Sequence, residues 1–118
     1  SYHYYRDIED FKSTYDTLNA KVPNKPKVLQ EYGMSSYKGV WNLYRGAAEE
    51  GQKEYYKEMQ QLLKDNNIPY MFWTLYDFKN VPSSVAGNLP WKTKKQHFFG
   101  CLDSLGNKKP AYFELINQ

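Results

Sequence analysis

Residues 70–76 read YMFWTLY, an almost unbroken apolar and aromatic run that follows Pro69. Such a run, without polar residues at every second position, is typical of a strand that is buried on both faces. Strands of this kind belong to parallel sheets, whose strands are joined by crossover connections that are usually helical. The run therefore predicts an α/β fold with a parallel sheet at its centre.

The segments around this run show alternating strand and helix patterns. Apolar residues at positions 8, 11, 15 and 18 repeat at intervals of three, four and three, which predicts a helix from the N-cap Asp7 to a point before Pro23. Further expected elements are strands at 1–5 and 27–32, a helix at 51–66, and a last helix that begins at Pro110. Loops are expected at 34–48 and 79–96, with a turn at 106–107. The predicted order is strand and helix in strict alternation.

The composition predicts one folded domain that spans residues 1–118. The formal net charge is small, at 16 − 13 = +3, and hydrophobic residues make up 41% of the chain, which excludes a disordered protein. With a single cysteine, Cys101, we expect neither an internal disulfide nor a four-ligand zinc site. We expect neither a metal nor a cofactor.

Two classes of partner are not expected. The longest apolar run is far shorter than the roughly 20 residues that cross a bilayer, and no basic and apolar leader opens the chain, so we expect neither a membrane partner nor export. Lys92, Lys94 and Lys95 form the densest basic stretch. Because nucleic-acid surfaces need a longer basic stripe, these lysines are interpreted as a solvated loop.

Two architectures fit the order of elements. Three strands with all helices on one side would leave Met71, Trp73 and Leu75 on a bare face. Either the helices cover both sides, as in a small doubly wound sheet, or the units form one sector of a (β/α)8 barrel, which takes about 250 residues. A doubly wound nucleotide-binding domain needs a glycine-rich turn after its first strand. Residues 6–9 are instead RDIE, whose acidic side chains would repel a phosphate group, so a nucleotide site is not expected there.

Polar and aromatic side chains follow the three expected strands at the ends where barrel enzymes place their reactive groups. Strict alternation puts His3 with Tyr5 on one side of the first strand, and Glu31 with Leu29 on one side of the second. It puts Trp73 with Leu75 on one side of the third strand. A cluster of His, Tyr, Glu and Trp is therefore expected at one rim.

Five motifs in chain order resemble the last three βα units of clan A glycoside hydrolases. They are YHYY at 2–5, KVLQEYG at 27–33, FWTLYDF at 72–78, FGCLD at 99–103 and KPAY at 109–112. Within the clan the chain is most similar to family 5, the cellulase and mannanase group, with the family 2 β-galactosidase and β-glucuronidase group next. The resemblance implies a partial barrel made of strands six to eight, which is the C-terminal part of a retaining glycosidase that acts on β-linked poly- or oligosaccharides.

The resemblance also implies roles for individual residues. Glu31 would be the catalytic nucleophile, Tyr5 would hold its carboxylate in line, and His3 would bond sugar hydroxyls. Trp73 would form the floor of the sugar subsite. Each role has a structural alternative. Glu31 could pair with a lysine, the first strand could be an aromatic core strand, and Trp73 could simply be buried in the core. Trp41 and Trp91 are candidates for further sugar platforms, although simple loop anchors are slightly favoured.

One part of the family pattern is missing. A retaining glycosidase needs a second carboxyl group about 5 to 5.5 Å from the nucleophile, and the family supplies it from an Asn-Glu pair on the fourth strand. Asp77 is the other acid at a strand end, and we interpret it as a loop-ordering residue. The chain alone is therefore expected to be inactive, and to pair through its bare face with the missing half or with another copy.

A non-catalytic carbohydrate-binding or scaffold remnant of such a barrel is the alternative. The sequence leaves open the glycan and the cellular location, with secretion one expectation for a full-length protein.

Overall fold

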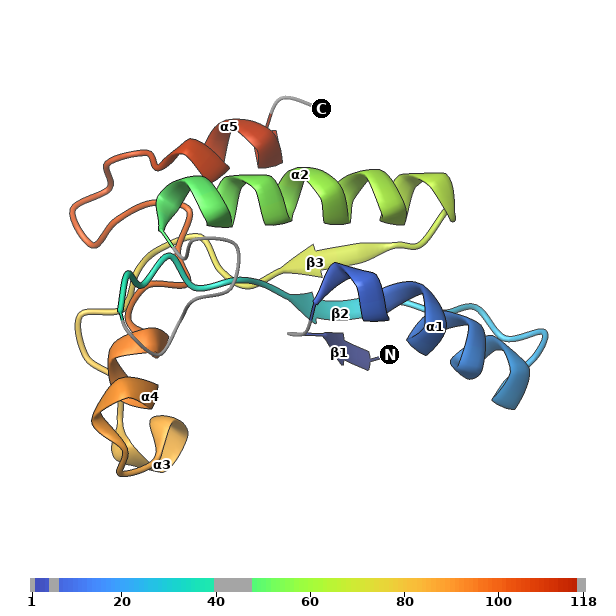
Figure 1. The fold of residues 1–118 in the computed structure, drawn as a ribbon, viewed down its shortest axis with the longest axis horizontal. Coiled ribbons are helices and arrows are strands. Elements are labelled where there is room, and N and C mark those ends of the chain that lie inside the picture. The colour runs from blue at the N-terminus through green and yellow to red at the C-terminus, as the bar shows by residue number, and fades with distance from the viewer. Residues whose placement is uncertain (1, 5–6, 40–47, 117–118) are drawn as a thin grey trace.

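The computed structural model describes residues 2–4, 7–39 and 48–116 (Figure 1). Its strands and helices follow one another in the order β1 (Tyr2–Tyr4), α1 (Ile8–Lys21), β2 (Leu29–Tyr32), α2 (Glu49–Asp65), β3 (Tyr70–Phe72), α3 (Ser83–Ala86), α4 (Pro90–Gln96) and α5 (Pro110–Ile116). The predicted alternation of strand and helix holds as far as β3, after which three short helices follow in place of the single last helix. In the described part of the chain, no helix has the length and apolar character needed to cross a membrane.

The three strands form a parallel sheet in the order β1-β2-β3. The central strand β2 pairs with β1 through Glu31 opposite His3, and with β3 through Tyr32 opposite Phe72. All three strands run in the same direction, so their carboxyl ends lie together at the left of the sheet in Figure 1. The sheet thus provides the common strand-end edge that the sequence predicts.

One hydrophobic core lies between the sheet and the helices α1, α2 and α5. The apolar spacing of α1 buries Ile8 and Phe11, and α5 contributes Ala111 and Leu115 from the helix that Pro110 begins. The largest contribution comes from α2, which buries Tyr55, Tyr56, Met59 and Leu63, together with Gln52 and Gln60. Because these helices share one core, they cover the same face of the sheet.

The third strand differs from its prediction in length and burial. It was expected to extend over 70–76 and to be buried on both faces, but β3 ends at Phe72. Tyr70 and Phe72 pack against the core, whereas Met71 is 55% exposed and Leu75 is 43% exposed. The expectation of burial on both faces is wrong because helices cover only one face. Of the three residues expected on the bare face, Met71 and Leu75 are exposed and Trp73 is partly buried.

The expected alternation along β2 is also wrong. Leu29 and Tyr32 are both fully buried in the core, although they are three positions apart. The pairing register between β2 and β3 shifts between these two residues, as it does where a β-bulge inserts one extra residue into a strand. Glu31 lies between them and is only partly buried, so the burial along β2 does not follow a strict period of two.

The segment 79–96, expected to be a loop, contains the short helices α3 and α4. Pro90 is the first residue of α4, where its fixed φ suits a helix and its missing N–H is not needed. Gly87 has φ +73°, a conformation that glycine adopts without strain, and it separates the two helices. The sequence pattern missed both helices because their few residues carry no apolar stripe.

Candidate functional site at the strand ends

Glu31 lies at the carboxyl end of the central strand, one residue before β2 ends at Tyr32. Its backbone pairs with that of His3 on β1, so the two positions are neighbours in the sheet. The Tyr32 carbonyl oxygen accepts a hydrogen bond from the backbone N–H of Trp73, with an N···O distance of 2.8 Å. The sheet therefore brings the predicted nucleophile and the predicted sugar platform to adjacent strand ends.

Trp73 is positioned where the chain leaves β3. Its peptide bond to Thr74 is cis, and its partly buried indole packs on Phe78 with ring centroids 5.7 Å apart. After Trp73 the chain pairs with 99–102, because Thr74 N–H donates to the Phe99 carbonyl and Cys101 N–H donates to the Thr74 carbonyl. The backbone of Trp73 thus lies between the end of β3 and this second backbone ladder, and its indole packs on Phe78.

Gly33 is needed where the two strand ends meet. A Cβ atom at this position would overlap the Trp73 carbonyl oxygen. That same oxygen accepts a hydrogen bond from the Tyr56 hydroxyl of α2 at 2.9 Å. The Glu-Tyr-Gly motif therefore has a structural reason for its glycine, which lets the backbone of 31–33 lie directly against Trp73. We call Glu31, Gly33 and Trp73 the strand-end site.

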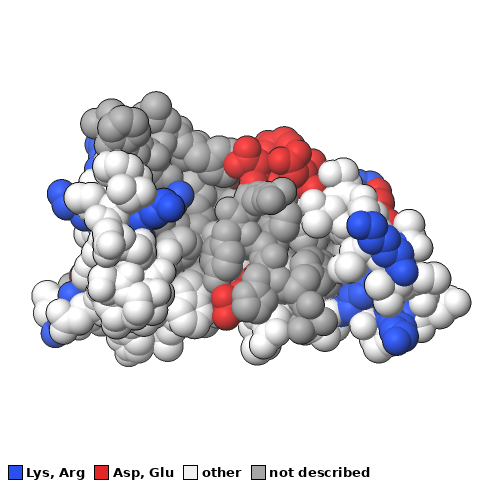
Figure 2. All heavy atoms as spheres, turned by 90° about the horizontal axis from the view of Figure 1, so that it is seen from below, with Lys and Arg blue, Asp and Glu red and all other residues white. Residues whose placement is uncertain are grey.

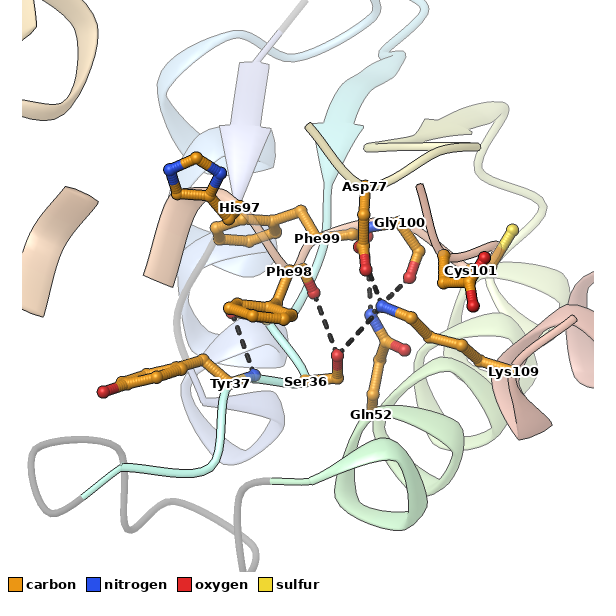
Figure 3. A network of polar contacts seen from close by, with 12 residues as sticks. Ser36, Tyr37, Gln52, Asp77, His97, Phe98, Phe99, Gly100, Cys101 and Lys109 are labelled. Atoms are coloured by element: carbon orange, nitrogen blue, oxygen red, sulfur yellow. Dashed lines mark hydrogen bonds and ion pairs between the residues drawn. The ribbon is translucent and has the colours of Figure 1, made fainter. Parts of the chain in front are cut away.

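A buried polar network connects the segments that follow β2 and β3 (Figure 3). The Lys109 ammonium group is 2.7 Å from Asp77 Oδ1, and both side chains are almost fully buried, at 4% and 8% exposure. Lys109 Nζ also donates to Ser36 Oγ at 3.0 Å, and the backbone N–H of Gly100 donates to Asp77 Oδ1 at 2.8 Å. Gln52 Nε2 donates to the Met34 carbonyl at 2.9 Å. We call Ser36, Gln52, Asp77, Gly100 and Lys109 the loop clamp.

The loop clamp joins the segments that follow β2 and β3. Ser36 belongs to the chain that leaves Glu31, and Asp77 belongs to the chain that leaves Trp73. One lysine on the N-terminal side of α5 bonds both of them. Gly100 packs so closely here that a Cβ would overlap the backbone of Tyr76 and Asp77. The interpretation of Asp77 as a loop-ordering residue is confirmed by these contacts.

Burial controls protonation near the site. Burial raises the pKa of the Tyr56 hydroxyl well above its usual range, so this group stays a donor to the Trp73 carbonyl. Burial also raises the pKa of the Cys101 thiol, which makes a reactive thiolate unfavourable at neutral pH. Among the described residues, no group of three His, Cys, Asp or Glu side chains is arranged to hold a metal ion.

The other predicted site residues have different outcomes. Tyr5 and Trp41 lie outside the described residues, and for His3 the description covers the backbone alone. Trp91 lies on α4 and is 41% exposed, beyond the carboxyl ends of the strands in Figure 1. Ser36, Gln52, Gly100 and Lys109 also belong to the site region, although none of them is a predicted site residue. The signal for two of them was present, since Gly100 and Lys109 lie in the quoted motifs at 99–103 and 109–112.

Comparison with known proteins gives structural matches alone. No family model and no curated protein matches the sequence. A glycoside hydrolase family 17 β-1,3-glucanosyltransferase from Rhizomucor miehei is similar, with a TM-score of 0.65 and 23% identity over 87% of this chain and 34% of that one. A putative β-galactosidase from Bacteroides fragilis has a TM-score of 0.67 and 22% identity, over 96% of this chain and 18% of its own.

An endo-laminarinase from Formosa Hel1_33_131 has a TM-score of 0.62 and 17% identity, over 93% of this chain and 27% of its own. This chain thus spans about a third of the family 17 enzyme and less of the other two. At such identities the matches establish the fold, which is an α/β arrangement that resembles part of a glycosidase barrel.

Proposed function

We propose that this chain is the C-terminal part of a retaining β-glycoside hydrolase in which Glu31 is the nucleophile. The observation that carries the proposal is the position of Glu31 at the carboxyl end of a central parallel strand, next to the strand end that leads into Trp73. Barrel enzymes bind substrate at this edge. The likeness to glycosidases of several kinds supports a glycosidase in preference to another barrel enzyme.

In the proposed reaction the Glu31 carboxylate attacks the anomeric carbon while the glycosidic bond to the leaving oxygen breaks. A general acid protonates that oxygen, and water later cleaves the glycosyl ester and frees Glu31. The acid has to come from another part of the polypeptide, since Asp77 is held by Lys109. His3 and Tyr5 would bond the sugar and the nucleophile, Trp73 would stack on the pyranose, and Trp41 and Trp91 are weaker candidates for platforms.

The substrate class that we propose to test first is β-1,3-glucan. The Rhizomucor enzyme is a β-1,3-glucanosyltransferase and the Formosa enzyme is a laminarinase. Membership of family 5, with cellulose or mannan as the substrate, is the sequence-based expectation and is the second choice. Laminari-oligosaccharides and cello-oligosaccharides of equal length would separate these two specificities.

Covalent trapping tests the nucleophile. A 2-deoxy-2-fluoro-β-glucosyl fluoride should add one fluoroglucosyl group to the peptide that contains Glu31, in the longest polypeptide that carries this chain. The fluoride leaves without protonation, so the label does not depend on the general acid. Mass spectrometry should find the label lost in Glu31→Gln and kept in Glu50→Gln, whose carboxylate is on the surface of α2. Label on a different carboxylate would refute the assignment.

The rival function is a non-catalytic carbohydrate-binding or scaffold remnant. It is favoured by one observation, which is that Asp77, the other acid that follows a strand, is bound by Lys109 and by the Gly100 backbone. A remnant would bind a laminari-oligosaccharide and leave it uncleaved, and its binding would survive Glu31→Gln.

We further propose that the bare sheet face is covered by another part of the same polypeptide, or by a second copy when the chain is alone. Light scattering of the isolated chain should give about twice the monomer mass of 14.0 kDa at high concentration. Met71→Lys should shift the chain toward monomer, whereas Leu105→Lys, at a turn residue that is 81% exposed, should not. A chain that stays monomeric at every concentration would contradict this proposal.

A further inference from the structure

The segment 79–101, which contains the short helices α3 and α4, carries lysines and no acidic residue. Between Phe78 and Leu102 the sequence contains Lys79, Lys92, Lys94 and Lys95 and no Asp or Glu. Within the part of the chain that the structure describes, these lysines form no ion pair, whereas Lys12, Lys53 and Lys109 do. The positive charge on this surface is therefore not neutralised by the fold.

The same surface exposes aliphatic side chains. Val85 of α3 is 69% exposed and Leu89, at the start of α4, is 41% exposed. Ala86 is the buried residue of α3, and no residue of α4 is buried. Figure 2 looks onto this end of the molecule, at its left, where lysines border a broad uncharged area. We call Lys79, Val85, Leu89, Lys92, Lys94 and Lys95 the basic patch.

The basic patch is fixed to the strand ends. Ser35 Oγ donates to the Lys95 carbonyl at 2.7 Å, and the His97 ring nitrogen Nδ1 lies 2.6 Å from the Phe78 carbonyl oxygen. The backbone N–H of Phe78 donates in return to the His97 carbonyl at 3.2 Å. These bonds attach the backbone of the patch to the strand-end loops, so little ordering of the backbone is needed when a partner binds.

We propose that the basic patch binds peripherally to a membrane surface that contains anionic lipids. Lysines are attracted to anionic headgroups, and exposed aliphatic side chains gain free energy when they enter the boundary between headgroups and acyl chains. Nucleic acids and acidic polysaccharides would also attract the lysines but offer no apolar phase to Val85 and Leu89. The combination of the two kinds of side chain favours lipid.

This proposal goes beyond the proposed glycosidase function and does not depend on it. It also revises the expectation of no membrane partner, which considered spanning segments and not surface contact. The patch lies at the strand-end side of the sheet in Figure 1, so membrane binding would hold the candidate site near the lipid surface. Trp91, which is part of α4, is left unchanged in the test because it is also a candidate sugar platform.

Co-sedimentation with vesicles tests the proposal. The chain should bind vesicles of equal parts phosphatidylserine and phosphatidylcholine at least about ten-fold more strongly than vesicles of phosphatidylcholine alone. The triple variant Lys92→Gln, Lys94→Gln, Lys95→Gln should bind about 100-fold more weakly, because each lysine contributes about a factor of five near such a surface. Val85→Gln should weaken binding while it leaves the salt dependence unchanged.

The matched control removes three lysines from the other end of the molecule. The triple variant Lys21→Gln, Lys25→Gln, Lys27→Gln has the same net charge and should keep most of the vesicle binding. An equal loss in both triple variants, or equal binding to neutral vesicles, would overturn the proposal. Tighter binding to heparin or DNA than to vesicles, with no effect of Val85→Gln, would also overturn it and would assign the patch to a soluble polyanion.

Discussion

Lys109→Met is expected to destabilise the chain by about 3–5 kcal/mol. The substitution keeps the length of the side chain but leaves the Asp77 carboxylate buried without its cation. It also removes the hydrogen bond to Ser36 Oγ. A small domain has roughly 5–15 kcal/mol of total stability, so the loss is a large share of it. Urea unfolding followed by circular dichroism should show a midpoint that falls strongly.

Two further variants distinguish the effect of breaking the buried Lys109–Asp77 ion pair from the effect of removing any lysine. Lys12 makes a comparable ion pair with Asp16 on the surface of α1, at 68% and 58% exposure. Lys12→Met should therefore cost less than about 0.5 kcal/mol. In the Lys109→Met background, Asp77→Asn should cost little or restore stability, because it removes the unpaired charge. Equal midpoints for Lys109→Met and Lys12→Met would contradict a stabilising role for the loop clamp.

The sequence was sufficient to predict the elements that depend on interactions between residues close together in the chain. Asp7 and the apolar spacing of 8, 11, 15 and 18 predicted α1, and Pro110 predicted the start of α5. The turn at 106–107 forms because Asp103 accepts hydrogen bonds from the backbone N–H groups of Leu105 and Asn107. These features depend on contacts within a few residues, which is why the pattern was sufficient.

Contacts between distant segments could not be predicted in the same way. Lys109 meets Asp77 across 32 positions and Ser36 across 73 positions, and no spacing rule relates these residues. Gln52 is fully buried on α2 because it bonds the Met34 carbonyl, although a glutamine is usually assigned to the solvent face. The register shift in β2 depends on the pairing with its neighbour, so strict alternation could not predict that Leu29 and Tyr32 are both buried.

For the candidate site, the sequence predicted which residues lie near the strand ends but not how they are held. Gly33 is an example. Only glycine fits at this position, because the carbonyl oxygen of Trp73, which is distant in sequence, occupies the space of a Cβ atom. Tyr56 was assigned to no role, yet its hydroxyl bonds that same carbonyl. The residue types could suggest candidates for sugar contact, whereas the residues that position the strand ends became evident only through packing.

Glu31→Gln is expected to lower the hydrolysis of a laminari-oligosaccharide by about 10,000-fold or more, in a polypeptide that also supplies the general acid. Glutamine has the same shape but cannot attack the anomeric carbon, so the glycosyl ester does not form. Sugar binding should change by only a few-fold, because stacking on Trp73 does not involve the carboxylate. Reducing-sugar release and calorimetric binding measure the two quantities separately.

Chemical rescue makes the assignment specific to a nucleophile. In Glu31→Ala, azide can enter the space left by the carboxylate and attack an activated β-glycoside from the same side, which gives a glycosyl azide of inverted configuration. A residue that only orders the site would give no such product. Glu50→Gln, an exposed change on α2, should leave hydrolysis unaltered. Full activity in Glu31→Gln would refute the nucleophile, and binding without turnover in the unsubstituted protein would favour the scaffold remnant.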